Sequence, residues 1–353
     1  MGTRILHSRS FFLCFLFNII SLTVQPNLYG GFLTNPPKNK GEMVWIPGGT
    51  FIQGAAKNDL MAMSHEKPAH RVRVNGFYMD VHEVTNQQFD SFVKATNYIT
   101  VAERAIRWEE LSKQLPPNTP KPPDSLLQPG SLIFRKSAEK LPNLIDFSQW
   151  WSWKIGANWR NPKGLKEPVQ LNPNDPVVHI AYEDAVAFAK WKGHRLPTEA
   201  EWEYASKAGG IDPFFWGADK TKLSRFANTW EGQFPYNNSQ QDGYEGIAPV
   251  KSYQPNAFGL YDMAGNVWEW TSDWYDARFY EQGFKPDEIA NNPKGPPRSV
   301  SANPYAQEKV IKGGSFLCSE SYCASFRSSA RMGASIDSGM EHLGFRTVWV
   351  PGE

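Results

Sequence analysis

The chain has 353 residues, of which 37 are basic and 36 acidic, so its formal net charge is +1. No basic tract marks a nucleic-acid partner, and the near balance of charge argues against a polyanion ligand. With 14 Trp, 28 Gly and 27 Pro, the composition is typical of a large, loop-rich globular protein rather than a helical bundle.

The N-terminal segment carries the features of an export signal. Arg4 and Arg9 precede an apolar run over residues 11–24, which is short and interrupted for a membrane span. We therefore interpret residues 1–30 as a signal peptide, 31–42 as a linker and 43–351 as one domain. The mature protein is then periplasmic or secreted, with no stable membrane association. An uncleaved signal anchor is the alternative.

Two segments near the start of the domain alternate apolar and polar residues. Residues 43–54 do so around a Pro-Gly-Gly turn, and residues 71–79 repeat the pattern, so both are predicted to be strands. Thr85 then stands as a helix N-cap, with Gln88 placed to close a capping box. The sequence predicts a short helix that ends near Asn97.

Residues 105–175 are irregular and rich in Pro, Lys and Trp. A loop this long inside a compact domain is usually functional or disordered. The cluster Trp-Trp-Ser-Trp at 150–153 indicates that the second half, through Arg160, is ordered. We predict that residues 150–160 either pack into the core or form the wall of a peptide groove, and the groove hypothesis predicts that Trp159→Ala raises KM with a milder loss of kcat.

Two further helices are predicted in the middle of the chain. Residues 181–193 place acidic side chains in the first turn and Gly193 at the stop. Residues 196–209 repeat this device, since Thr198 and Glu201 form a capping box and Gly209 follows. From residue 214 onward the pattern indicates small strands and irregular backbone.

The residues that most clearly indicate a chemical function are Cys318 and Cys323, which follow a Lys-Gly-Gly-Ser turn. The third cysteine, Cys14, lies in the apolar N-terminal run. A close cysteine pair can be a metal clamp, a redox couple or a small disulfide loop. A disulfide across so short a loop stabilises by roughly 2 kcal/mol or less in the loop-length model. We therefore favour a chemical role for the cysteine pair over a structural disulfide. In an oxidising compartment such a pair is either bridged or held by a metal.

Four motifs resemble the formylglycine-generating enzyme family, also called sulfatase-modifying factors. They are Arg-Leu-Pro-Thr-Glu-Ala-Glu-Trp-Glu-Tyr at 195–204, Gly-Leu-Tyr-Asp-Met-Ala-Gly-Asn-Val-Trp-Glu-Trp-Thr at 259–271, Gly-Gly-Ser-Phe at 313–316 and Leu-Gly-Phe-Arg at 343–346. Their order and spacing extend the resemblance from about residue 43 to 349. The resemblance implies a single α+β domain related to C-type lectins and low in regular secondary structure.

The same superfamily contains iron-dependent sulfoxide synthases and non-catalytic members, so the fold alone does not fix the function. The histidines of this chain offer no His-x-x-x-His pair on a helix, which disfavours the iron enzymes. The segment from Ser315 through Cys318, Tyr322 and Cys323 instead resembles the catalytic segment of formylglycine generators.

That resemblance implies a reaction and a set of site residues. Cys318 and Cys323 would hold Cu(I), for which thiolates are selective, and O₂ would be the co-substrate. The substrate would be the cysteine of a Cys-x-Pro-x-Arg motif in an unfolded or nascent sulfatase, converted to formylglycine. Ser315 and Trp268 would line the oxygen and substrate pocket, with Tyr322 beside it. The rival reading is a non-catalytic, lectin-like binding or structural module with a Cys318–Cys323 disulfide.

The resemblance also implies two calcium sites built from oxygen ligands. The first comprises Asn228, Thr229, Asp242 and Tyr244, and the second Asp262, Gly265, Val267 and Glu269. Each set taken alone could equally be an Asx turn or a helix cap.

The chain departs from the family pattern close to the cysteines. Ser319 stands where some relatives carry histidine, and Ile336 and His342 stand where proline and asparagine are usual. These departures affect substrate details and leave the proposed copper pair intact.

Overall fold

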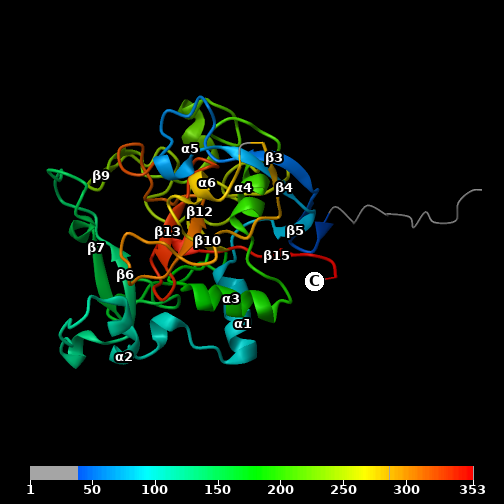
Figure 1. Ribbon diagram of the computed structural model, residues 1–353. Coiled ribbons are helices and arrows are strands. Elements are labelled where there is room, and N and C mark those ends of the chain that lie inside the picture. The colour runs from blue at the N-terminus through cyan, green and yellow to red at the C-terminus, as the bar shows by residue number, and fades with distance from the viewer. Residues whose placement is uncertain (1–38, 286, 353) are drawn as a thin grey trace, which may run out of the picture. The chain divides into compact units, whose positions relative to one another are not determined.

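The fold consists of short strands and short helices joined by long irregular segments, as Figure 1 shows. The computed structural model describes residues 39–285 and 287–352, which belong to one compact unit. The predicted signal peptide, Cys14 and most of the predicted linker lie outside the described residues. Within the described ranges, no helix is long and apolar enough to cross a membrane.

The described α-helices are short, and only three exceed two turns. In chain order they are α1 (Asn86–Thr96), α2 (Trp108–Leu111), α3 (Tyr182–Trp191), α4 (Glu199–Lys207), α5 (Leu223–Phe226) and α6 (Phe279–Gln282). Short 3₁₀ turns fill several connections, among them η5 (Phe147–Gln149).

The described strands form two four-stranded sheets, one three-stranded sheet and two hairpins. They are β1 (Asn39–Lys40), β2 (Met43–Ile46), β3 (Gly49–Gln53), β4 (His70–Val74), β5 (Phe77–Asp80), β6 (Gly130–Phe134), β7 (Trp151–Ile155), β8 (Gly232–Gln233), β9 (Asn237–Asn238), β10 (Trp268–Trp274), β11 (Ile289–Asn291), β12 (Glu308–Lys312), β13 (Met332–Ser335), β14 (Leu343–Gly344) and β15 (Val348–Trp349).

The sheet order β13-β12-β10-β14 positions the cysteine segment. Strand β12 leads into that segment and pairs with β10 in antiparallel register, with Glu269 opposite Lys312. Strand β14 runs parallel to the start of β10, so Trp268 lies opposite Leu343. Three segments that are distant in sequence therefore meet at the N-terminal end of β10.

The strands predicted from alternation are confirmed, each divided in two by its turn. Residues 43–54 form β2 and β3, and residues 71–79 lie in β4 and β5. The first predicted helix is α1, with the Thr85–Gln88 capping box present and Asn97 in the left-handed conformation at its end. Asparagine tolerates that conformation better than most residues, which suits it to end a helix.

The two predicted central helices are also confirmed. Helix α3 ends before Gly193, whose φ is +70°. Helix α4 has the Thr198–Glu201 capping box. Its left-handed cap is Ala208, one residue before the predicted Gly209, and the φ of Gly209 is also positive.

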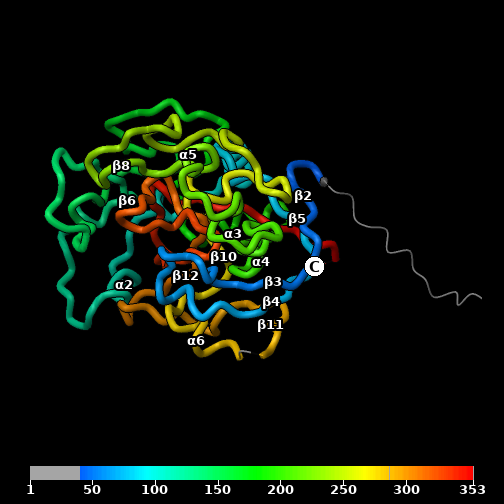
Figure 2. The backbone as a smooth tube through the Cα atoms, turned by 90° about the horizontal axis from the view of Figure 1, so that it is seen from above, coloured from blue at the N-terminus to red at the C-terminus, as the bar shows by residue number. Residues whose placement is uncertain are grey.

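The segment 105–175 is irregular as predicted, but it contains an unpredicted hairpin. Strands β6 and β7 pair in antiparallel register from Gly130 opposite Ile155 to Phe134 opposite Trp151. Figures 1 and 2 both place this hairpin and α2 on the side of β12, away from β2 and β5. The segment therefore contributes ordered structure near the cysteines.

Four cations whose side chains are fully buried, Lys312, Arg327, Arg331 and Arg346, each bind a buried carboxylate and so tie these irregular segments together. Each carboxylate belongs to α4, β10 or the turn before β4, and each cation lies in or after β12. The pairs are Lys312–Glu203 at 2.9 Å, Arg327–Glu66 at 2.6 Å, Arg331–Glu199 at 2.6 Å and Arg346–Glu269 at 2.7 Å. Removing one partner of a fully buried pair leaves an uncompensated charge, so each pair fixes its segment strongly.

Candidate active site around the cysteine pair

The cysteine segment begins with a tight glycine turn after β12. Gly313 and Gly314 have φ values of +92° and +75°, and a Cβ on Gly314 would lie 2.8 Å from the backbone of Ser325. Glycine is needed at such positions because side chains are excluded by both the backbone conformation and the close approach. The turn folds the segment back so that Cys318 N–H donates to Ser315 O at 2.8 Å.

The two thiols are neighbours and are not bridged. Cys318 is buried and Cys323 is partly exposed, and both are free cysteines. Burial, together with the adjacent Cys323, raises the pKa of Cys318 well above its usual value. Burial opposes ionisation of Cys323 as well, but hydrogen bonds from the Cys318 thiol and from Ser325 outweigh it and lower the pKa of Cys323. The pair is therefore a thiol that donates to a neighbouring thiolate-prone sulfur.

Ser315 lies beneath this pair and faces His342. Its Oγ accepts from Leu317 N–H at 3.2 Å and lies 3.4 Å from His342 Nδ1. Because the Leu317 bond occupies an acceptor position, the hydroxyl hydrogen is free to point to Nδ1. The hydrogen of this contact can lie on Ser315 Oγ or on Nδ1, and His342 Nε2 has no partner among the described residues. Burial lowers the pKa of His342 to about 3, so the ring is neutral.

Trp268 lies two residues after Asn266, whose backbone carbonyl accepts from Phe316 N–H of the cysteine segment at 2.8 Å. Trp268 begins β10, is 1% exposed and belongs to the same apolar cluster as both cysteines. Its backbone N–H donates to His342 O at 2.8 Å. The structure thus brings the predicted Trp268 and Ser315 together with the cysteines, and His342 connects them.

Tyr322 lies on the outer side, between aromatic rings. It stacks on Phe234 with ring centroids 4.7 Å apart and meets Trp150 edge-on at 5.4 Å. Burial and the nearby thiols raise the pKa of Tyr322 to about 12, so it remains a protonated phenol. Its predicted role beside a substrate pocket stays a prediction.

Two residues near the site were not named among its predicted members, although Trp151 lies in the segment predicted as a possible groove wall. The ring of Trp151 meets that of His342 edge-on, with centroids 4.7 Å apart. Trp151 belongs to the tryptophan cluster noted in the sequence, and His342 to the departures from the family pattern. Both residues stood out in the sequence, but their contact forms because the β6–β7 hairpin brings Trp151 to His342. Trp159, the candidate groove wall, is instead buried at 2% exposure against Phe89.

The first predicted calcium set is brought together around Asp242. Its carboxylate accepts from the backbone N–H groups of Thr229 at 2.8 Å and Tyr244 at 3.1 Å. The neighbouring Asn228 donates through its amide to Gly246 O, while its buried Oδ1 has no partner among the described residues. The orphaned Asn228 oxygen belongs to the residue before Thr229, whose N–H Asp242 binds, and two such oxygen donors suit a Ca²⁺ ion, so these residues fit the group.

The second predicted calcium set does not fit as a whole. Both oxygens of Glu269 accept from Arg346, at 2.7 and 2.8 Å, and one also accepts from Trp202 Nε1 at 2.8 Å. Asp262 retains one buried oxygen without a described partner, and burial raises its pKa to about 6. Glu269 is thus neutralised by an arginine and is not a free ligand.

A cluster of protein ligands complete in itself is not found. Within the described ranges, no three His, Cys, Asp or Glu side chains converge as a metal site would require. The cysteine pair therefore supplies two soft donors, and a third ligand would have to come from outside the described residues. This donor set fits Cu(I), which accepts low coordination by sulfur.

Known proteins resemble this chain over most of its length. Residues 30–351 match the family model of the sulfatase-modifying factor enzyme 1-like domain. The formylglycine-generating enzyme of Thermomonospora curvata is 40% identical over 312 residues, covering 88% of this chain and 93% of that protein. The Bos taurus enzyme of the same name is 38% identical over 324 residues, covering 91% and 78%.

Two other relatives limit what the likeness implies. The inactive C-alpha-formylglycine-generating enzyme 2 of Bos taurus is 31% identical over 328 residues, covering 92% of this chain and 93% of that protein. Among solved structures, PvdO from Pseudomonas aeruginosa has a TM-score of 0.59 at 24% identity, covering 87% and 93%, which is a likeness of fold. The predicted α+β fold is confirmed, and the chain belongs to the formylglycine-generating enzyme family of sulfatase-modifying factors.

Proposed function

We propose that this protein converts a cysteine of client sulfatases to formylglycine and so activates them. The observation that carries the proposal is the unbridged pair of Cys318 and Cys323, with a raised pKa on one sulfur and a lowered pKa on the other. Identities of 38–40% to named formylglycine-generating enzymes support it. The substrate would be a Cys-x-Pro-x-Arg segment of an unfolded or nascent sulfatase.

Cys318 and Cys323 would hold Cu(I). When bound, the ion would offer the client thiol a third soft position and allow O₂ to act as the oxidant. Oxidation of the client Cβ supplies two electrons and gives a thioaldehyde, which water converts to the aldehyde and hydrogen sulfide. Reduction of O₂ to two waters takes four electrons, so a thiol reductant must supply the other two.

The chain's own residues would orient and enclose the client cysteine. Ser315 Oγ accepts from Leu317 N–H and faces the neutral ring of His342, and it would contact the client cysteine. Trp268 closes the inner side, and Tyr322 stacks on Phe234 at the outer side. Excluding bulk water from such a site protects a reactive intermediate from side reactions.

Export and calcium complete the proposal. Residues 1–30 would direct the protein to the periplasm or the outside. The set of Asn228, Thr229, Asp242 and Tyr244 would bind Ca²⁺ in a structural role, and two observations support it: the orphaned Asn228 oxygen and the bond of Asp242 to the adjacent Thr229.

The rival function is a non-catalytic, lectin-like binding or structural module with a Cys318–Cys323 disulfide. The 31% identity to a protein named as inactive keeps this rival open. Titration with Cu(I) under reducing conditions separates the two. The enzyme proposal predicts one tight equivalent that disappears when both cysteines are replaced by serine. Equal copper binding by the native and doubly substituted proteins would contradict it.

A further inference from the structure

Strand β7 has an outer edge whose backbone groups are unpaired. The bond from Gly156 N–H to Pro129 O, at 2.9 Å, continues the β6–β7 ladder one residue beyond β7. Backbone groups alternate in direction along an antiparallel strand, so Trp151 and Trp153 direct their N–H and C=O groups away from β6. No described residue forms a backbone hydrogen bond with these groups, and β7 pairs with β6 alone in the described sheets.

The chain covers the opposite edge of the hairpin but leaves most of this one open. On β6, Leu132 O accepts from Glu341 N–H at 3.0 Å, and Phe134 N–H donates to the Glu341 carboxylate at 2.8 Å. On β7, a Cβ on Gly164 would lie 3.2 Å from Ile155 O, so the open part of the edge is at Trp151 and Trp153. Native proteins usually protect exposed edges with a proline, a bulge or a free charge, and this part of β7 has none of them.

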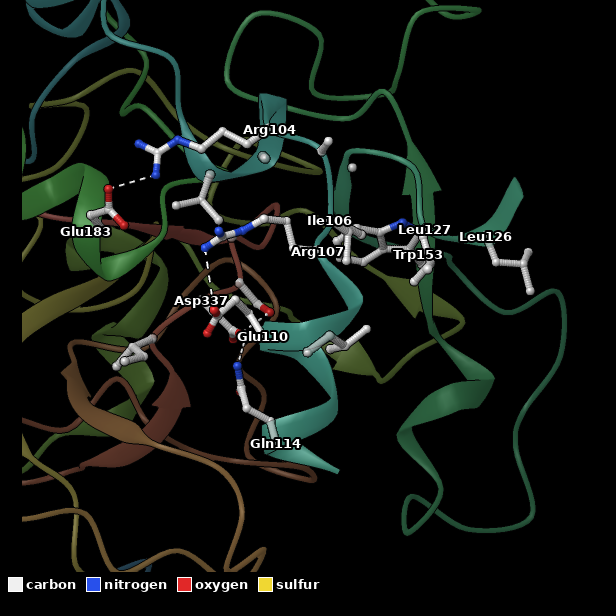
Figure 3. Close-up of a pocket in the computed structure, with 18 of the residues that line it drawn as sticks. Arg104, Ile106, Arg107, Glu110, Gln114, Leu126, Leu127, Trp153, Glu183 and Asp337 are labelled. Carbon is white, nitrogen blue, oxygen red and sulfur yellow. Dashed lines mark hydrogen bonds and ion pairs between the residues drawn. The ribbon is translucent and has the colours of Figure 1, made fainter. Parts of the chain in front are cut away.

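The side chains along this edge are large and apolar. Trp151 and Trp153 lie two residues apart and so share one face of the hairpin, and Trp153 is 42% exposed. Figure 3 shows Trp153 with Ile106 and Leu127 at one end of a cavity of about 680 Å³. A row of free N–H and C=O groups beside apolar side chains is the surface to which an extended polypeptide adds as a further strand. An extended chain matches it because it offers donors and acceptors at the spacing of a strand.

The open edge begins next to the residues of the candidate active site. Trp150, the residue before β7, meets the ring of Tyr322 edge-on at 5.4 Å, and Tyr322 directly precedes Cys323. Trp151, the first residue of β7, meets the ring of His342 at 4.7 Å. A polypeptide bound at this edge would therefore start beside the cysteine segment. That position favours a client of the enzyme over a second copy of this chain as the occupant.

We propose that the open edge of β7 pairs, as a β-strand, with an extended segment of the client polypeptide next to the reactive cysteine. The proposal rests on the proposed function for the identity of the client. The proline of the Cys-x-Pro-x-Arg motif has no backbone N–H, so the pairing segment is expected to include residues that flank the motif. Recognition through the backbone would hold the client extended and would depend little on the side chains of its flanks.

The first test is a scan of the client backbone. A motif peptide in which serine replaces the reactive cysteine is made with a single N-methyl group on each flanking backbone amide in turn. Dissociation constants are measured by fluorescence anisotropy with the full-length protein. Along a paired strand every second amide faces the partner, so methylation there should weaken binding by about tenfold. Methylation of the intervening amides is the internal control and should change binding less than about twofold.

The second test removes a donor from the edge itself. Trp153→Pro deletes the outward N–H and leaves the ladder with β6 intact, because proline is tolerated where the N–H faces away from the sheet. Trp153→Ala is the matched control, since it loses the same ring but keeps the N–H. Trp153→Pro should bind the unmethylated peptide about tenfold more weakly than Trp153→Ala. Equal melting temperatures show that both variants are folded, and if Trp153→Pro melts lower, the scan on the native protein decides.

Two outcomes overturn the pairing: a scan without alternation on either flank, or equal binding by folded Trp153→Pro and Trp153→Ala. A dimer of the free protein that dissociates in Trp153→Pro alone would assign the edge to a second copy and overturn the client as occupant. The matching cysteine peptide is assayed for aldehyde in parallel. Alternation without aldehyde would leave the pairing standing and defeat the proposed function, and aldehyde without alternation would do the reverse.

Discussion

At the residue scale, the cysteine pair gives the clearest prediction. Serine at Cys318 or Cys323 exchanges a soft donor for a hard one, so Cu(I) affinity and turnover should each fall by at least about 10²-fold. The fold should persist, because both thiols are free and no bridge is lost. Copper titration, peptide turnover and the melting temperature test this, with Ser321→Ala as a nearby control. Near-normal turnover in either serine variant would defeat the copper assignment.

His342 should matter through the serine hydroxyl that it holds. Alanine removes the partner of Ser315 Oγ, and a lost hydrogen bond of about 1–1.5 kcal/mol predicts roughly a tenfold fall in kcat. Asparagine can present an amide oxygen to the same hydroxyl, so His342→Asn should recover much of the loss. Copper affinity should stay the same in both variants. If alanine and asparagine gave the native kcat, Ser315 would not depend on this residue.

The sequence revealed these residues unevenly, for a physical reason. Ser315, Cys318, Tyr322 and Cys323 lie within one short motif, so their proximity needs no knowledge of the fold. Trp151 reaches the site only through the pairing of β6 with β7, which no local pattern signals. The same tryptophan-rich segment places Trp159 in the core. The prediction that Trp159→Ala would selectively raise KM is therefore replaced by the expectation of a core defect.

At the element scale, buried ion pairs fix the loops around the cysteine segment. Arg331 donates to both oxygens of Glu199 in α4, at 2.6 and 2.9 Å. Arg331→Met would leave that carboxylate buried and unpaired, which should cost about 3–5 kcal/mol of unfolding free energy. Urea denaturation measures the loss, with the exposed Arg225→Met as control. A variant as stable as the native protein would show that the pair contributes nothing net.

Calcium removal should destabilise the loop around Asp242. Without the ion, the orphaned Asn228 oxygen stays unsatisfied, so chelation should lower the melting temperature and Ca²⁺ should restore it better than Mg²⁺, which demands tighter octahedral geometry. Asp242→Asn keeps an acceptor for the turn but loses the charge, and should abolish the response. Glu269→Gln should destabilise equally with and without chelator, because it strands Arg346. A chelator response that survives in Asp242→Asn would place the ion elsewhere.

Elements with local signals were predictable and those with distant partners were not. The capping boxes of α1 and α4 specify helix starts within four residues, and both helices begin there. Strand β14 has only two residues and exists because β10 lies beside it. The residues of the first predicted calcium set lie close together because Asp242 accepts from Tyr244 N–H in a local turn. Glu269 of the second predicted set instead accepts from Arg346, which is distant in the sequence.

At the scale of the whole molecule, stability should depend on pH through Asp273. Burial and the nearby Glu199 carboxylate raise the pKa of Asp273 to about 7, against about 4 in an unfolded chain. Between these values the native state keeps a proton that the unfolded state has released. Its contribution is therefore complete below about pH 4 and is lost as the pH rises through 7. As the pH rises, this group should lower the unfolding free energy of the native protein by up to about 1.4 kcal/mol per pH unit, and Asp273→Asn should remove that part of the pH dependence. Parallel pH profiles in the two proteins would refute this.

The fold class was predictable as a whole because its motifs have a characteristic order. Local patterns alone predicted only α1, α3, α4 and the strands of residues 43–79. The remaining architecture depends on long-range ion pairs such as Arg346–Glu269, whose partners are 77 residues apart and carry no pattern in the sequence. The cavity beside Trp153 belongs to this second kind of feature.

The central claim is tested most directly by incubating the protein with Cu(I), a thiol reductant and a Cys-x-Pro-x-Arg peptide, with and without O₂. Mass spectrometry and hydrazide capture then report the aldehyde. The account predicts catalytic conversion of the cysteine to formylglycine in O₂ and none under argon, and none when Cys318 and Cys323 are both serine. Peptide that stays unmodified after long incubation in O₂, although copper is bound and the protein is folded, would contradict this account.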